Sequence, residues 1–127
     1  MSNRTDPYTS FNYLISLEGT ILGGFTEMSK IQGTHKVGDV TLKRGLIDST
    51  SLSNWIASAR SSPMSAKKQV TITLRNEANQ PVELYKLSQA TPTKYTGPTL
   101  SGKGSGDVAI EELVLACENI VIETPPR

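Results

Sequence analysis

The sequence is poor in the residue types that metal sites and nucleophilic catalysis use. It contains one cysteine and one histidine in 127 residues. A single cysteine cannot form a disulfide within the chain, and a single histidine without a Cys/His cluster gives no metal-ligand spacing. Cys117 lies in an apolar run, which favours a small buried hydrophobe over a reactive thiol. His35 lies in a polar stretch, and we expect it to be solvated.

Charge of one sign is not in excess either. Thirteen basic residues face twelve acidic ones, which gives a net charge of +1. That balance excludes the basic footprint typical of duplex nucleic-acid binding and of attraction to an anionic membrane surface. The sequence has no phosphate loop, nucleophile elbow or calcium loop, and the adjacent Glu111 and Glu112 would point to opposite faces of a strand. We therefore expect no enzyme, no cofactor, no metal ion and no sequence-specific nucleic-acid binding.

Long apolar runs are also missing. Residues 1–7 hold no apolar core of signal-peptide length, and no later stretch is long enough to span a bilayer. We expect synthesis in the cytoplasm, no classical export signal and no insertion into a membrane. The length and a hydrophobic fraction of 36% suit one folded domain over residues 1–127. Within it, residues 1–9 are expected to form a flexible arm and residues 123–127 a frayed tail.

Alternating apolar and polar residues predict a chain made mainly of strands. The alternation is clearest at residues 69–75, where Val70, Ile72 and Leu74 alternate with polar side chains. The polar residues 26–37 show no strand pattern. Strands are predicted at residues 11–17, 21–25, 38–45, 69–75 and 82–87, with an extended piece at 89–95.

One segment has the spacing of an amphipathic helix. Over residues 51–61, Leu52, Trp55, Ile56 and Ala59 fall at positions i, i+3, i+4 and i+7, which makes one apolar stripe. The chain then continues into Ser-Ser-Pro, which ends a helix. We expect this helix to cover one open side of a sheet.

The segment at residues 107–118 fits two structures equally well from its pattern. Ile110, Leu113, Val114 and Cys117 lie at helical spacing. The same residues also fit a strand with a bulge at the adjacent glutamates. The apolar run at residues 120–122 favours a further strand after it.

The motifs taken together resemble the tube proteins of contractile phage tails and of phage-tail-like extracellular injection systems. The resemblance runs nearly end to end, and its most specific parts are the Leu-Lys-Arg-Gly step before the tryptophan helix and the late Ala-Ile-Glu-Glu-Leu run. The motifs that carry it are Asp6-Pro7-Tyr8, Phe11-Asn12-Tyr13-Leu14, Gly23-Gly24-Phe25, Val40-Thr41-Leu42-Lys43-Arg44-Gly45, the Trp55 helix, Thr91-Pro92-Thr93-Lys94-Tyr95, Gly97-Pro98 and Val108-Ala109-Ile110-Glu111-Glu112-Leu113-Val114-Leu115-Ala116.

The resemblance implies a mainly β fold in which two packed β-sheets form a barrel-like sandwich with one flanking α-helix. It resolves residues 107–118 in favour of strands. It also implies a structural subunit of an inner tube: six copies close a ring by joining sheets edge to edge, and rings stack inside a contractile sheath. The implied partners are the sheath protein, spike or baseplate proteins, and effector cargo or phage DNA in the lumen. Such a protein is made in the bacterial cytoplasm and becomes part of an assembled particle.

Two sets of site residues follow from the resemblance. The set expected at the intersubunit interface is Gly23, Gly24, Lys43 and Arg44. The set expected on a polar strand face, which either lines the lumen or lies on the outer surface, is Thr71, Thr73 and Arg75. The two basic side chains either form intersubunit salt bridges or belong to a solvated strand end.

One departure from the family pattern leaves the exact role open. Tube proteins of this kind usually carry a longer excursion before the step that here reads Lys30-Ile31-Gln32-Gly33, and that excursion contacts the neighbouring ring. The short segment at residues 26–33 therefore fits a tube subunit with reduced ring-to-ring contact, a tube-initiator or baseplate adaptor ring, or a sequence from which a loop has been left out. A further alternative is a secreted ring that binds effectors in its lumen, as the related type VI secretion tube protein does.

Overall fold

The computed structural model describes residues 10–30, 38–62, 64, 66–97 and 107–124. The predicted arm at residues 1–9, His35 and the end of the predicted tail at residues 125–127 lie outside this part of the chain. The described elements are β1 (Tyr13–Leu17), β2 (Thr20–Lys30), β3 (Gly38–Asp48), α1 (Ser49–Ser61), β4 (Lys68–Arg75), β5 (Pro81–Thr96), β6 (Asp107–Cys117) and β7 (Asn119–Glu123).

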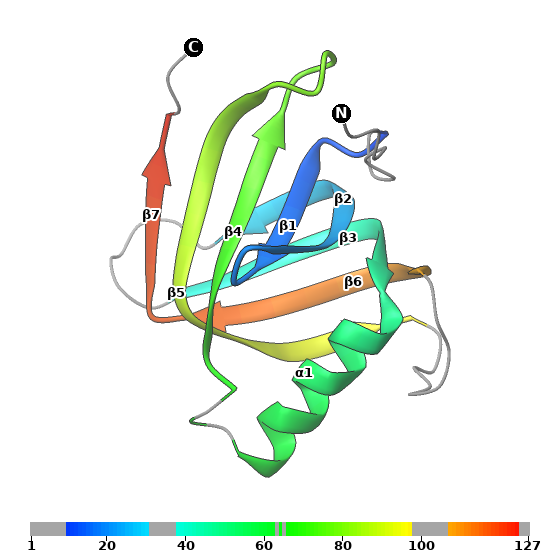
Figure 1. Ribbon diagram of the computed structural model, residues 1–127, viewed down its shortest axis with the longest axis vertical. Coiled ribbons are helices and arrows are strands. Elements are labelled where there is room, and N and C mark those ends of the chain that lie inside the picture. Colours follow the sequence, from blue (N-terminus) through cyan, green and yellow to red (C-terminus); the bar gives the residue numbers. More distant parts are fainter. Residues whose placement is uncertain (1–9, 31–37, 63, 65, 98–106, 125–127) are drawn as a thin grey trace.

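Six of the strands close into a barrel. Their order is β4-β1-β2-β3-β6-β5, and β4 also pairs with β5, which completes the circuit. All of these pairings are antiparallel. The strand β7 pairs with β5 outside the circuit. Figure 1 shows two layers whose strands cross at a steep angle, with β1, β4, β7 and part of β5 in one layer and β2, β3, β6 and the rest of β5 in the other.

The corners between the layers lie in β2 and β5, the two strands that each take part in both layers. In β2, the corner contains a register shift against β1 and the pair Gly23 and Gly24. A Cβ atom on Gly23 would lie 2.8 Å from the Cα atom of Ile47, so only glycine allows this approach of β3. In β5, the corner contains Gln89 with a φ of +56°, and the strand changes partner there from β4 to β6.

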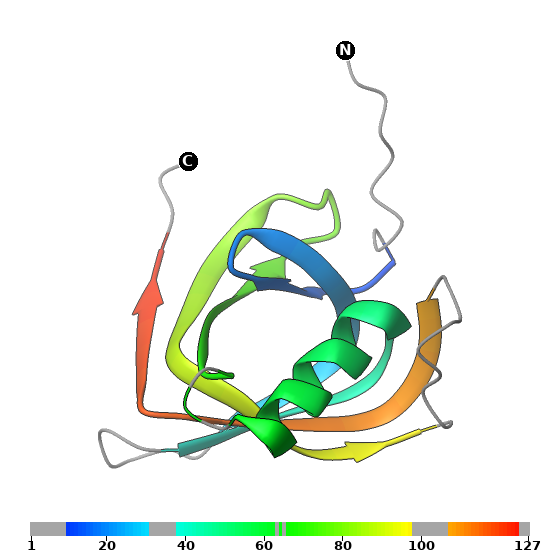
Figure 2. The same cartoon turned by 60° about the horizontal axis from the view of Figure 1, so that its bottom comes forward.

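The core fills the inside of the barrel, and α1 lies across one open end of it (Figure 2). The helix presents Leu52 and Trp55 to this core, and both are buried. The indole N–H of Trp55 donates a hydrogen bond of 2.7 Å to the carbonyl oxygen of Ala66. The largest fully buried side chains are Trp55, Phe25, Ile15, Leu22, Leu42, Ile47, Leu52, Ile72, Leu87, Leu113, Leu115 and Val40.

The structure confirms the predicted mainly β, barrel-like fold with one flanking helix. It also confirms the strand at residues 107–118 that the resemblance favoured, so the helical alternative is wrong. In β6 the buried residues Ile110 and Leu113 are three positions apart, so the alternation of core-facing side chains shifts by one residue between them. The pairing of β6 with β3 stays in register there, so this phase change involves no bulge. The position across from this phase change is Arg44, whose φ of +57° rotates the strand locally.

Three strands are longer than the pattern predicts. The strand β3 continues past its predicted end at Gly45 to Asp48, and α1 follows at Ser49. The strand β2 continues to Lys30 through residues that were expected to show no strand structure, and β5 is continuous over both of its predicted pieces. Pro92 did not interrupt β5, because the strand is hydrogen-bonded there only to β6 among the described residues.

Cys117 is buried at the end of β6, and burial raises the pKa of its thiol, as is typical of a structural cysteine.

Tyr85 makes the stability of the barrel sensitive to alkaline pH. Its side chain is buried and donates a 2.7 Å hydrogen bond to the Glu83 carboxylate, and burial is the main reason that its pKa rises to about 12. The unfolded chain loses this proton near pH 10, so the stabilisation is complete below pH 10 and is lost between about pH 10 and 12. For this one group the free energy of unfolding falls by about 1.4 kcal/mol per pH unit at most.

We therefore expect the urea-unfolding free energy to fall between pH 10 and 11, and to fall less steeply in Tyr85→Phe. The phenylalanine variant keeps the ring and removes the titrating hydroxyl. Equal slopes in the two proteins over this interval would show that other groups control the alkaline transition.

Candidate functional site

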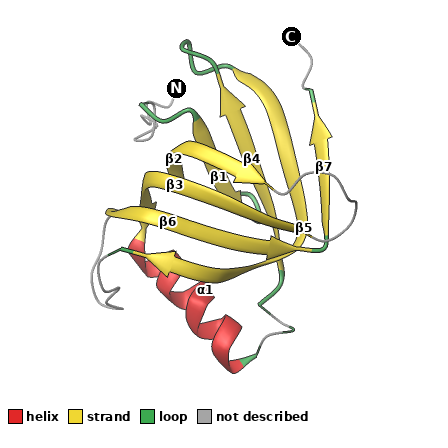
Figure 3. Ribbon diagram, turned by 180° about the vertical axis from the view of Figure 1, so that it is seen from behind, coloured by secondary structure: helices red, strands yellow, loops and turns green. Residues whose placement is uncertain are grey.

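The layer formed by β2, β3, β6 and β5 ends in two open strand edges. Among the described residues, positions 27–30 of β2 pair only with β3, and positions 91, 92 and 94–96 of β5 pair only with β6. Figure 3 shows the two edges at opposite ends of this layer, with β3 and β6 between them. An open edge presents unpaired backbone N–H and C=O groups and can add a strand from another chain.

The two edges are compatible with each other in direction. Because neighbouring strands in the layer are antiparallel throughout, β2 and β6 run one way and β3 and β5 run the other way. Placing the β2 edge of a second copy along the β5 edge of the first therefore continues the antiparallel pattern. Such a joint uses different surfaces on the two copies, so it repeats from copy to copy and generates a ring or a filament.

The outer face of this layer carries a row of alternating charge. The strand register places Glu27 of β2 beside Lys43 of β3, and Lys43 beside Glu112 of β6. Lys94 of β5 reaches the Glu112 carboxylate at 3.3 Å, and Arg44 lies 3.6 Å from the Glu27 carboxylate. Each pair has at least one partner whose side chain is more than half exposed, so each contributes about 1 kcal/mol or less to folding.

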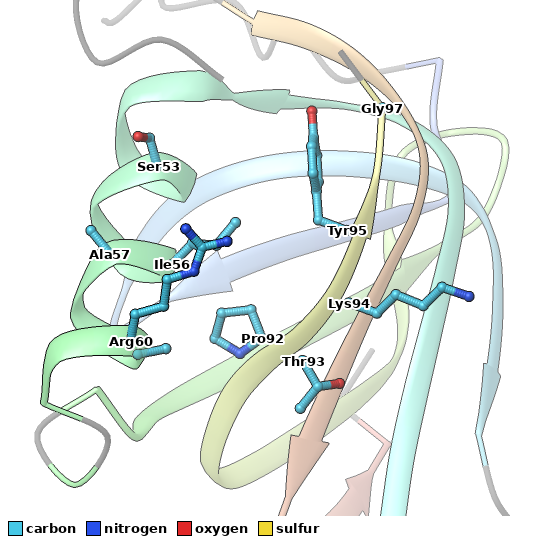
Figure 4. Close-up of a pocket in the computed structure, with 10 residues that line it drawn as sticks. Ser53, Ile56, Ala57, Arg60, Pro92, Thr93, Lys94, Tyr95 and Gly97 are labelled. Carbon is cyan, nitrogen blue, oxygen red and sulfur yellow. The ribbon is translucent and has the colours of Figure 1, made fainter. Parts of the chain in front are cut away.

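The other face of the β5 edge borders an open groove against α1 (Figure 4). The groove has a volume of about 690 Å³ and takes apolar surface from Ile56 and Ala59 of the helix and from Pro92 and Tyr95 of the strand. Lys94 extends away from the helix in this view. Burial raises the pKa of the Tyr95 hydroxyl above its ordinary value. The β5 edge thus has one side toward the groove, where apolar residues lie together with polar ones such as Arg60, and one charged side on the outer face.

The residues predicted at the interface lie in two different places. Gly23 and Gly24 are buried in the part of β2 that is paired on both sides, with β1 and with β3. A Cβ atom on Gly24 would lie 2.9 Å from the Cβ atom of Phe11, so this glycine serves packing within the chain. Lys43 and Arg44 are exposed on the outer face of the four-stranded layer, one strand in from its edge.

The three residues predicted on a polar strand face do not share one environment. Thr71 and Thr73 are half-buried on β4, in the layer opposite the two open edges. Arg75 is only 6% exposed, and its guanidinium donates a 3.0 Å hydrogen bond to the carbonyl oxygen of Phe11. Arg75 therefore ties the segment before β1 to the end of β4 and does not extend the threonine face.

Sequence reasoning did not select Glu27, Lys94 and Glu112, although the structure brings them to one face. A signal was present at the end of β2, where Thr26 and Met28 alternate with Glu27 and Ser29. The relation of these residues to Lys94 could not be read from the sequence, because it depends on strand pairing across about 70 residues.

The described residues give no indication of a metal site or of a membrane-spanning helix. Within them, no group of three or more His, Cys, Asp or Glu side chains is placed to hold a metal ion. A search of the described helices finds none that is both long and apolar enough to cross a membrane. The surface that remains as a candidate site is the pair of open edges with its charged row and groove.

Comparisons with known proteins agree with this architecture. The chain is similar to the tube-terminating cap of the anti-feeding prophage, with 17% identity, coverage of 98% of this chain and 96% of that chain, and a TM-score of 0.62. It is similar to a chain of the extended PVC sheath–tube complex of an extracellular contractile injection system, with 20% identity, coverage of 98% and 100%, and a TM-score of 0.63. At these identities the likeness shows the fold.

A third similar structure is the extended sheath/tube terminator of the PVC extracellular contractile injection system, with 18% identity, coverage of 97% and 99%, and a TM-score of 0.62. No curated protein sequence matches the chain. The family model described as T4-like virus tail tube protein gp19 matches residues 23–121, from the corner of β2 to the middle of β7. The chain therefore belongs to the gp19 tail tube protein family.

Proposed function

We propose that this chain is a structural subunit of the inner tube of a contractile injection apparatus, in which six copies form a ring and rings stack into a hollow tube. The observation that carries the proposal is the pair of open, direction-matched edges on one four-stranded layer. Membership of a tail tube family assigns the chain a structural role and no catalysis. The number of copies per ring comes from the resemblance to tube proteins.

The position of the barrel supports a proposal for the face that lines the channel. One face of the four-stranded layer is covered by the chain's own core, so the bulk of each copy lies on that side. In a closed ring, this bulk fits on the convex side, where the circumference is larger. The channel is then lined by the opposite face, which carries Glu27, Lys43 and Glu112. In this arrangement Thr71 and Thr73, in the other layer, lie toward the outside of the tube.

The channel would carry effector cargo or phage DNA, and the outside of the tube would meet the sheath. A wall of alternating charge and hydroxyl groups has little net charge and few apolar contacts, so a passing molecule is not held by it. The similarity to sheath–tube and terminator structures supports a place for this chain in such an assembly.

A second candidate role is a ring that starts or ends the tube or joins it to the baseplate. The short segment at residues 26–33, which begins inside β2 (Thr20–Lys30), favours this role, because tube proteins usually carry a longer excursion before the Lys30-Ile31-Gln32-Gly33 step. Electron microscopy of the purified chain, alone and with sheath and baseplate proteins, distinguishes the two roles. A main tube subunit gives long tubes, and an initiator or terminal ring gives single rings.

Disulfide trapping tests the edge-to-edge joint directly. In a Cys117→Ala background, we expect Ser29→Cys combined with Lys94→Cys or with Thr96→Cys to give a ladder of covalent oligomers that ends at six copies. Directly opposed residues on antiparallel strands are about 4.5–5.5 Å apart at Cα, which a disulfide can bridge, so the variant that crosslinks reports the register.

The matched control combines Ser29→Cys with Gln69→Cys, an exposed position on β4 in the opposite layer. It should run as a monomer on a non-reducing gel. A wild-type chain that forms neither rings nor tubes with any partner, together with no ladder from either edge variant, would overturn the proposed function.

A further inference from the structure

The charged row across the four-stranded layer ends with opposite charges at the two open edges. The β2 edge carries Glu27, whose side chain is 53% exposed, and the β5 edge carries Lys94, whose side chain is 62% exposed. Between them the row reads acidic, basic, acidic through Glu27, Lys43 and Glu112. Lys94 therefore supplies the next basic position, and another acidic group would continue the alternation beyond it.

We propose that Lys94 of one copy binds Glu27 of the next copy, and that this pair selects the β2 edge as the partner of the β5 edge and holds their register. This inference rests on the proposed ring. It adds the residues of the joint and the reason that each β5 edge accepts a β2 edge and no other.

The geometry within the chain shows that Lys94 has the required reach. The residue directly across from Lys94 on β6 is Val114, and Glu112 lies diagonally, across from Thr96. Lys94 nevertheless contacts the Glu112 carboxylate at 3.3 Å. We call the register in-step when the charged row continues straight across the joint, so that Glu27 of the next copy lies beside Thr96. Glu27 of the next copy is then diagonal to Lys94, on the side of β5 that faces away from Glu112. The ammonium group then lies between two carboxylates, each one strand away.

The residues first expected to bridge copies are less suited to this task. Lys43 is flanked on both sides by strands of its own chain, β2 and β6, so its neighbours in the row are Glu27 and Glu112 of the same copy. Arg44 lies 3.6 Å from Glu27 within the chain and helps to hold that carboxylate on the outer face of the edge.

The other face of the joint offers apolar side chains beside polar ones, and its apolar part fits the same arrangement. Met28 alternates with Glu27 and Ser29 on β2, so it lies on the opposite face, where it packs against the core. In the in-step register, Met28 of the next copy comes to lie beside Tyr95, next to the groove between α1 and β5. The joint then has an apolar side that contributes affinity and a charged side that contributes specificity.

A register error would be costly. A shift by one residue would move Glu27 to the apolar side and Met28 to the charged side, because side chains alternate along a strand. Pairing two β5 edges would place Lys94 against Lys94, and pairing two β2 edges would place Glu27 against Glu27. Like charges at an interface cost several kcal/mol, so both wrong joints are disfavoured.

Two charge reversals test the pair between separate molecules. Glu27→Lys places lysine against Lys94 at every joint, and Lys94→Glu places glutamate against Glu27 at every joint. We expect each variant alone to lose at least about tenfold in the yield of rings or tubes counted by electron microscopy, because the like charges meet at every joint. An equimolar mixture of the two purified variants should recover wild-type yield to within about threefold, because alternating copies place opposite charges at every joint.

Recovery on mixing reports contacts between copies, because it leaves each chain's internal contacts unchanged. Circular dichroism melting of both variants confirms that each monomer is folded. The matched control is Lys86→Glu, the same charge change on the same strand, which also removes one internal ion pair, to Glu123 at 3.1 Å. It should assemble as the wild type does, because residues 84–88 of β5 are covered by β7.

The outcomes separate this inference from the function on which it rests. If the wild type forms rings and both single variants do so equally well, the Lys94–Glu27 pair is overturned and the tube function stands. A mixture that assembles no better than either variant alone overturns the pair in the same way. If the wild type forms no ring under any of these conditions, both proposals are overturned.

Discussion

Replacing Trp55 by alanine is expected to lower the free energy of unfolding by about 3–5 kcal/mol, the range for removing a large aromatic side chain from a core. Trp55 is only 2% exposed and is, with Leu52, one of the two large apolar residues that α1 buries in the core. The change also removes the indole donor from the Ala66 carbonyl oxygen, a buried hydrogen bond of 2.7 Å. Urea unfolding followed by far-UV circular dichroism measures the loss, since Trp55 is the only tryptophan and its fluorescence disappears with it.

Two variants separate the parts of this effect. Trp55→Phe keeps an aromatic ring and loses the donor, so we expect a smaller loss, of about 1–3 kcal/mol. Asn54→Ala, on the exposed side of the same helix turn, should change the free energy of unfolding by less than about 0.5 kcal/mol. A Trp55→Ala protein as stable as Asn54→Ala would show that the helix is not needed to close the barrel.

Replacing Gly45 by alanine is expected to cost at least about 3 kcal/mol, at the upper end of what overpacking a core costs. A Cβ atom on Gly45 would overlap the carbonyl oxygen of Gly24 and lie 2.5 Å from the Cδ2 atom of Phe25. Neither neighbour can move easily, since one is the backbone of the adjacent strand and the other is a fully buried ring. The clash lies next to the β2 corner, so relieving it would open the barrel there.

Gly97→Ala is the matched control for this prediction. The nearest atom to a Cβ on Gly97 is the Tyr95 hydroxyl oxygen at 2.9 Å, the far end of a side chain on an exposed strand end. We expect a change below about 1 kcal/mol at this position. Thermal melting of the two variants beside the wild type makes the comparison, and equal melting temperatures for the two would contradict the close approach of β2 and β3 at Gly45.

Most of the fold could be predicted because its strands carry local signals. Alternation placed β1, β3, β4 and the start of β5, and the i, i+3, i+4, i+7 stripe placed α1. Residues 107–118 were ambiguous for a physical reason: the inward face of β6 changes phase at its two glutamates, and a phase change in a strand imitates the spacing of a helix. The resemblance to tube proteins resolved it correctly.

The candidate site was harder to predict because it is made of relations between strands. The end of β2 contains one large apolar residue, Met28, so its alternation gives a weak signal. Arg75 continues the polar alternation of β4 in sequence, but a register shift beside it turns its side chain to the carbonyl oxygen of Phe11. Which edges remain open follows only from the complete pairing of the sheet. No local pattern contains that information.

The number of strands in the open layer has a consequence for symmetry. The layer contributes four strands, an even number, so its first and last strands run in opposite directions. Strand direction therefore alternates without a break around a ring of any number of copies. With an odd number, every joint would have to be parallel. An even number of strands per copy is thus compatible with a ring of any number of copies. The number of copies is selected by the curvature of the sheet at each joint.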